Sequence, residues 1–102
     1  MNVTEFVTKV MNDKNFMYEV FTHIPDSMMS EENQGNSDQQ GELGKSFGKF
    51  CWPGAQAMGC TFAENDLVAE CERQVNALRG FGKAKFLVRM IKTLGKAKPK
   101  KR

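Results

Sequence analysis

The chain has 102 residues, with 15 Lys or Arg against 12 Asp or Glu, a formal net charge of +3 and 40% hydrophobic residues. This length fits one domain with a small core, which leaves few buried positions for catalytic side chains. No apolar run approaches the roughly twenty residues of a membrane span, and no secretory signal is visible, so we expect a cytoplasmic protein, with export after processing left open.

Two short amphipathic helices are predicted at the start of the chain. Apolar residues recur at helical spacing over residues 3–11, and a second set covers residues 16–24 and stops at Pro25. Asn12 and Asp13 between the two sets suit a helix break with a new N-cap. The sequence therefore predicts a helical hairpin.

A polar segment follows the hairpin. Residues 30–46 are almost entirely Ser, Glu, Asn, Gln, Gly and Asp, and residues 30–41 contain no apolar residue. Burial cannot offset the ordering entropy of such a stretch. We expect a long flexible loop inside one bundle, because the preceding pair of helices is too small to be stable alone.

An aromatic cluster and a well-marked helix come next. Residues 47–52 include two Phe and the single Trp, and Pro53 is placed as the first residue of a short helix that ends at Gly59. Residues 61–64, Thr-Phe-Ala-Glu, have the form of a capping box. The helix that they open extends to Gly80 and carries one apolar face, formed by Leu67, Val68, Cys71, Val75 and Leu78.

The end of the chain is strongly basic. Residues 73–102 contain eleven Lys or Arg and no carboxylate, whereas residues 1–72 hold all twelve carboxylates and four lysines. A last helix is predicted over about 83–95, with one apolar arc of about 140° formed by Phe86, Leu87, Met90, Ile91 and Leu94. Such a cationic arm favours an anionic partner. The predicted contacts are Arg79, Lys83, Lys85, Arg89, Lys92, Lys96, Lys98, Lys100, Lys101 and Arg102.

These elements predict an all-α fold. We expect a small bundle of four to five short helices, with a long polar loop near residues 30–46 and a disordered basic C-terminal tail. The chain divides by charge into an acidic helical part, residues 1–80, and a cationic amphipathic helix with its tail, residues 81–102.

Two stretches resemble the nitrogen-fixation-type leader-peptide family. Residues 6–13, Phe-Val-Thr-Lys-Val-Met-Asn-Asp, followed by Phe16, are similar to the first helices of this family. Residues 55–62, Ala-Gln-Ala-Met-Gly-Cys-Thr-Phe, followed by Glu64 and Asp66, are similar to its second landmark: a short helix, a glycine, an aromatic residue and an acidic helix start. Together the two stretches cover about a third of the chain.

The resemblance implies a helical leader that a modifying or exporting enzyme recognises, ahead of a C-terminal product segment. The implied recognition residues are Phe6, Val10, Phe16, Phe62 and Leu67. The family often marks its leader boundary with adjacent glycines, whereas Phe81 here separates Gly80 from Gly82. Residues 81–102 contain no Cys or Ser and one Thr, so the implied product is an unmodified cationic helix with membrane or antimicrobial activity.

No catalytic, cofactor or metal site is predicted. Cys51, Cys60, Cys71 and His23 lack the short C-x₂₋₄-C unit of structural zinc sites, and burial as small apolar side chains explains Cys51 and Cys71. The chain has a single His and no Cys–His motif, so it lacks the combination of side chains that nucleophilic catalysis requires. We therefore expect a non-enzymatic protein without cofactors.

Two functions fit the family resemblance and the basic arm. The first is a leader-type protein that a processing partner recognises and that carries a cationic, membrane-active C-terminal segment. The alternative is a non-specific nucleic-acid-binding protein that uses the same cations. A membrane-active helix must expose its apolar residues at some stage, whereas a nucleic-acid-binding arm can bury them permanently against the bundle.

Overall fold

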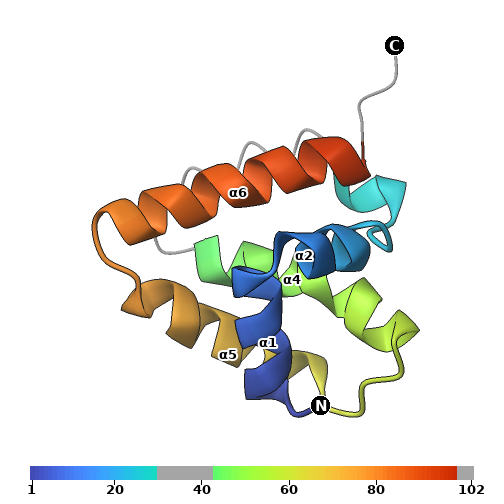
Figure 1. The fold of residues 1–102 in the computed structure, drawn as a ribbon. Helices are drawn as coiled ribbons and strands as arrows, with labels where there is room; N and C mark the ends of the chain where they lie inside the picture. Colours follow the sequence, from blue (N-terminus) through green and yellow to red (C-terminus); the bar gives the residue numbers. More distant parts are fainter. Residues whose placement is uncertain (30–42, 99–102) are drawn as a thin grey trace.

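The computed structural model describes residues 1–29 and 43–98, which form helices and their connections without a strand. The predicted all-α bundle is confirmed for this part of the chain (Figure 1). The elements in chain order are α1 (Val3–Asn12), α2 (Lys14–Phe21), the 3-10 helix η1 (Asp26–Met29), α4 (Leu43–Ala57), α5 (Glu64–Ala77) and α6 (Phe81–Ala97).

The predicted N-terminal hairpin is confirmed, with side-chain caps at both helix starts. The Asn2 side chain accepts the Glu5 backbone N–H at 2.8 Å, and the Glu5 carboxylate accepts the Asn2 N–H at 3.0 Å. This reciprocal pair is a capping box that was not among the predicted helix starts. The Asp13 carboxylate accepts the N–H groups of Asn15 and Phe16 at 3.0 and 3.2 Å, so the new N-cap predicted at Asn12–Asp13 is confirmed, and Asp13 provides it.

Helix α4 begins earlier than predicted. It starts at Leu43, so residues 43–46 are helical and Pro53 lies inside the helix rather than at its first position. Proline has no N–H for the carbonyl four residues earlier, which disfavours it in a helix interior. Burial of one face extends α4 across Pro53; the buried residues are Gly44, Phe47, Gly48, Cys51, Gly54 and Ala55. The rest of the predicted loop, 30–42, lies outside the described residues.

The end of α4 at Gly59 is confirmed. Gly59 has φ +80, and its N–H donates to the Gln56 carbonyl at 3.1 Å. The Cys60 N–H donates to the Ala55 carbonyl at 3.0 Å. These two bonds around a left-handed glycine form a Schellman motif, which satisfies carbonyls that the helix end leaves unpaired.

The capping box predicted at Thr61 is wrong. The N-cap of α5 is Ala63, which makes no side-chain cap bond. Thr61 precedes this N-cap by two residues, and the Phe62 ring packs on Phe6 with their centroids 5.6 Å apart, which holds the segment outside the helix. Helix α5 also ends at Ala77 rather than Gly80, because Leu78 adopts an extended backbone (φ −73, ψ 146) that leads the chain toward α6.

Glycines let α4 lie very close to its neighbours. A Cβ added to Gly48 would lie 2.8 Å from the Cα of Val68 on α5, and one added to Gly54 would lie 2.8 Å from the Val20 carbonyl on α2. Both distances are too short for a side chain. The close α4–α5 and α2–α4 approaches therefore depend on the missing Cβ atoms.

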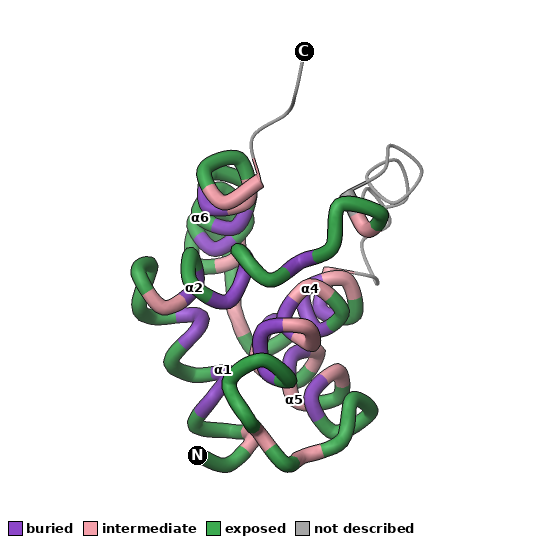
Figure 2. The backbone as a smooth tube through the Cα atoms, turned by 90° about the vertical axis from the view of Figure 1, so that its right-hand side faces the viewer, coloured by how far each residue is buried: buried purple, intermediate pink, exposed green. Residues whose placement is uncertain are grey.

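Helix α6 lies along one side of the bundle and packs mainly against α2 (Figure 1). Phe86 and Met90 are each only 5% exposed, and the Phe86 ring meets Phe47 of α4 edge to face at 4.9 Å between centroids. In Figure 2 the buried stretches of α6 face the bundle and its exposed stretches face outward. The hydrophobic core is therefore continuous from α1 to α6. The division predicted between residues 80 and 81 stays a prediction.

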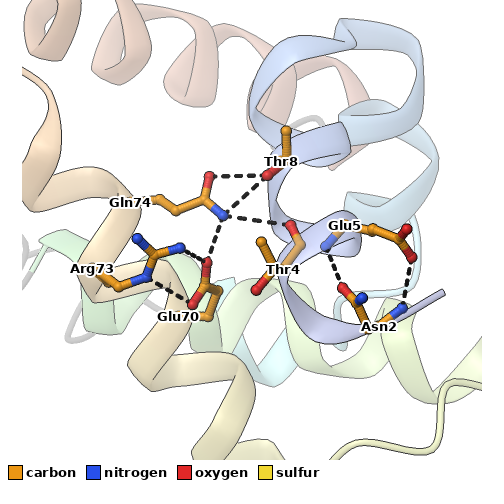
Figure 3. A network of polar contacts seen from close by, with 7 residues as sticks. All are labelled: Asn2, Thr4, Glu5, Thr8, Glu70, Arg73 and Gln74. Atoms are coloured by element: carbon orange, nitrogen blue, oxygen red, sulfur yellow. Dashed lines mark hydrogen bonds and ion pairs between the residues drawn. The ribbon is translucent and has the colours of Figure 1, made fainter.

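Gln74 joins α5 to α1 (Figure 3). Its amide nitrogen donates to the Thr4 carbonyl at 3.4 Å, to the Thr8 hydroxyl at 3.1 Å and to the Glu70 carboxylate at 2.8 Å. Arg73 forms an ion pair with the same carboxylate. The bonds that Glu70 accepts, first from Arg73 and then from Gln74, lower the pKa of its carboxyl below the ordinary value.

Candidate anion-binding surface

Helix α6 has an inner and an outer face. On the inner face Phe86, Met90 and Thr93 are buried. Four large apolar side chains of the same helix are exposed: Phe81 at 88%, Ile91 at 58%, Val88 at 50% and Leu87 at 38%. The apolar arc predicted for this helix is thus divided, because the bundle covers Phe86 and Met90 and leaves Leu87 and Ile91 in solvent.

Cations accompany the exposed apolar residues. Four exposed cations stand on α6, and no Asp or Glu occurs anywhere in that helix. We call the exposed apolar and cationic residues together the α6 outer face; they are Phe81, Lys85, Leu87, Val88, Arg89, Ile91, Lys92 and Lys96.

An open hollow of about 630 Å³ lies beside α6. Five cations and no carboxylate line it; the complete lining is Lys14, Phe81, Ala84, Lys85, Val88, Arg89, Lys92, Thr93 and Lys96. Lys14 belongs to α2 and was not predicted as a site residue. No sequence signal connects Lys14 to a helix some seventy residues later, because only the packing of α6 on α2 brings the two together.

Arg89 also has a structural contact. Its Nη1 donates to the Met11 carbonyl at 2.8 Å, near the C-terminal end of α1. A guanidinium at this position satisfies a terminal carbonyl and meets the negative end of the helix dipole. Arg89 therefore holds α6 over α1 and lines the hollow at the same time.

Most cations of the α6 outer face lack an acidic partner. Within residues 1–29 and 43–98, the ion pairs are Arg73–Glu70 and Lys98–Asp26, the latter at 3.6 Å. Lys98, one of the predicted contacts to an anionic partner, is therefore already paired with Asp26 of η1. Lys85, Lys92 and Lys96 pair with no carboxylate of the described part.

The ten predicted cationic contacts do not all gather in one place. Four of them line the hollow: Lys85, Arg89, Lys92 and Lys96. Arg79 is exposed just before α6 and Lys83 is half-buried on it, but neither lines the hollow. The last three predicted contacts, Lys100, Lys101 and Arg102, lie outside the described residues.

The recognition residues implied by the resemblance lie in or against the core. Phe6, Val10 and Leu67 have no exposed surface. Phe16 and Phe62 are partly buried, and their rings pack on Phe6 at 5.7 and 5.6 Å between centroids. Recognition through these residues stays a prediction, and it requires that the bundle open to expose the three buried side chains.

The cysteines and the histidine are dispersed. Cys51 and Cys71 are buried, and burial, together with the neighbouring Cys71 thiol, raises the pKa of Cys51 well above its ordinary value. Cys60 is half-buried and His23 is exposed. Over residues 1–29 and 43–98, no three His, Cys, Asp or Glu side chains are grouped so that they hold a metal ion.

Comparisons with protein-family models, curated proteins and solved structures found no match for this chain. Among the described helices, none combines the length and apolarity of a membrane-crossing segment. The leader-family resemblance and the function that it implies are therefore proposals.

Proposed function

We propose that this is a non-enzymatic binding protein that docks on a phosphate-bearing anionic partner through the α6 outer face. The observation that carries the proposal is the hollow beside α6, with five cations and no carboxylate in its lining. Ammonium and guanidinium groups donate charge-assisted hydrogen bonds to phosphate oxygens.

The inner face of α6 supports a permanent binding surface. Phe86 and Met90 belong to the core, so the folded bundle fixes the orientation of the helix and displays its cations outward. Fixing a binding element before association lowers the entropy lost when the partner binds. A detached basic tail lacks this advantage.

The proposal is tested by titrating salt against binding to two phosphate polyanions, a duplex DNA and vesicles that contain phosphatidylglycerol. Neutralisation of about four phosphates predicts a loss of DNA affinity of roughly a hundredfold between about 50 and 200 mM salt. For vesicles we expect a loss in the same direction because salt screens the surface potential. Absence of binding to both polyanions at low salt would contradict the proposal.

A leader-type precursor is the second candidate, and the connection between α5 and α6 favours it. Arg79 and Gly80 are exposed, Gly80 has φ +50, and Phe81 is 88% exposed. Exposed connections outside helices are preferred sites of proteolysis. The test is the intact mass of the protein recovered from its native cells. A cut near residues 79–82 supports the precursor function, and an uncut chain removes it.

A further inference from the structure

We propose that the anionic partner is the surface of a lipid bilayer, on which the folded bundle docks with α6 parallel to the membrane. This inference rests on the proposed function and names its partner. The supporting observation is the exposure of apolar side chains on α6, because binding of an anion alone does not account for them. Of the seven large apolar residues exposed in the described part of the chain, four belong to α6: Phe81, Leu87, Val88 and Ile91.

The apolar and cationic residues of the α6 outer face form two parallel strips. At 100° per residue, Phe81, Val88 and Ile91 fall within an arc of about 80°, and Leu87 continues its edge. Lys85, Arg89, Lys92 and Lys96 occupy a neighbouring arc of about 60°. Helix α6 is about 25 Å long; the apolar strip covers residues 81–91 and the cationic strip covers residues 85–96, so the two run side by side over residues 85–91, about 10 Å.

This arrangement fits a bilayer interface better than a nucleic acid. Phosphates of DNA or RNA require the cations only, and their hydrated backbone offers no apolar surface to Val88 and Ile91. At a bilayer, apolar side chains enter the boundary between headgroups and acyl chains while neighbouring Lys and Arg side chains reach the phosphates. The apolar strip of α6 then lies at the boundary between headgroups and acyl chains, and the cationic strip lies at the phosphates.

The hollow beside α6 is lined by the same two kinds of residue, apolar and cationic. Phe81 and Val88 contribute apolar surface, while Lys14 and Lys92 belong to the cations of its lining. In a phospholipid only the glycerol and its ester groups separate the negative phosphate from the acyl chains, so the cationic and the apolar lining residues contact different parts of one lipid molecule. Lys14 adds a charge from α2, which ties the site to the folded bundle rather than to an isolated helix.

Docking leaves the core intact. Phe86 and Met90 remain in the bundle while the opposite side of α6 meets the membrane, so the binding is peripheral. This separates the proposal from a released amphipathic helix, which inserts Phe86 and Met90 as well.

The experiment is vesicle flotation with the full chain, using phosphatidylcholine vesicles with and without phosphatidylglycerol. The test variant is Val88→Ser/Ile91→Ser, which keeps all charges and changes only exposed residues. The control is Met58→Ser, which changes an exposed apolar residue outside α6, 37% exposed. We expect binding only to the anionic vesicles, about tenfold or more weaker for the test variant and within about twofold of wild type for the control.

Duplex DNA binding, measured at the same salt concentration, completes the test. If both polyanions bind and only vesicle binding depends on Val88 and Ile91, the lipid proposal is supported. Unchanged vesicle binding by the double variant, or binding to DNA without vesicle binding, overturns the lipid proposal and leaves the anionic-partner function in place. Failure to bind either polyanion overturns both.

A second readout reports the position of α6 itself. In the Trp52→Phe protein with Ile91→Trp, the new indole should be quenched by lipids brominated on their acyl chains, and with Met58→Trp in the same background it should not. Equal quenching at the two positions would contradict docking through α6. We expect thermal melts of all variants in solution to show that the substitutions leave the bundle folded.

Discussion

Cys51 and Cys71 act as small apolar core residues. Both have no exposed surface, and burial raises the pKa of the Cys51 thiol, which keeps it protonated and unreactive. With a thiol reagent at neutral pH, we expect Cys60 to react first and the other two cysteines to react only as the protein unfolds. In Cys60→Ser the rapid phase should disappear. A rapid phase that persists in this variant would show that a core thiol is accessible.

The Glu70 carboxylate is a second residue with a measurable consequence. Arg73 and Gln74 hold its pKa below the ordinary value, so the carboxylate stabilises the fold at neutral pH, and this contribution is lost as the pH falls through its lowered pKa. The contribution is below about 1 kcal/mol, because the partner side chain Arg73 is 64% exposed and screened by water.

We therefore expect Glu70→Gln to be slightly less stable than wild type at pH 7, and the difference to shrink below about pH 4. Urea unfolding at several pH values measures this difference. Glu19→Gln, on the exposed side of α2, is the control for the loss of one negative charge. A Glu70→Gln difference that stays constant from pH 7 to pH 3 would contradict the assigned ion pair.

At the scale of helices, the spacing between α4 and α5 depends on Gly48. A Cβ at this position would lie 2.8 Å from the Cα of Val68, a backbone atom that cannot turn away. Gly48→Ala should therefore lower the free energy of unfolding by about 1–3 kcal/mol in spite of the better helix propensity of alanine.

Gly95→Ala provides the matched control, since a Cβ there meets no atom within 4 Å. This change should raise the free energy of unfolding by about 0.5–1 kcal/mol, because alanine restricts the unfolded chain in a helix position that it readily adopts. Opposite signs for the two substitutions in urea unfolding are the expected result. A stabilising Gly48→Ala would show that α4 and α5 are not packed this closely.

Local signals predicted some helix boundaries and missed others. The N-cap at Asn12–Asp13 and the helix end at Gly59 follow from short-range chemistry, and both are confirmed. Pro53 and Thr61 carried equally clear local signals, yet α4 continues through Pro53 and α5 starts after Thr61. In these two places packing decides: the buried face of α4 and the Phe62–Phe6 contact override the local preference.

The candidate site was predicted only in part for the same reason. Helical periodicity placed Phe86, Leu87, Met90 and Ile91 in one apolar arc, but it cannot say which edge of the arc a neighbouring helix covers. The structure buries Phe86 and Met90 and exposes the other two. Lys14 shows the limit more clearly, since its place in the hollow depends on a tertiary contact between α2 and α6.

At the scale of the whole molecule, α6 is part of the bundle that it covers. A chain that ends at Arg79 loses Phe86 and Met90 from the core. Loss of a buried Phe or Met side chain costs about 2–5 kcal/mol each, against a total stability of about 5–15 kcal/mol for a domain. We expect this truncated chain to lose its cooperative thermal transition.

A chain that ends at Lys98 is the control for truncation itself, because it keeps all of α6 and the Lys98–Asp26 ion pair. It should melt as cooperatively as the full chain. If the chain ending at Arg79 melts like the control, α6 is a separable segment and the leader-type precursor gains support over the permanent binding surface.

The most direct measurement of the central claim compares two double variants that remove the same number of charges. Lys85→Gln/Lys92→Gln removes two cations from the α6 outer face, and Lys45→Gln/Lys49→Gln removes two exposed cations from α4. Each Lys near an anionic membrane contributes about 1 kcal/mol, so the first variant should bind phosphatidylglycerol vesicles roughly thirtyfold more weakly than wild type. The second should stay within a few-fold of wild type. Equal losses in the two variants would mean that net charge, rather than the outer face of α6, attracts the partner.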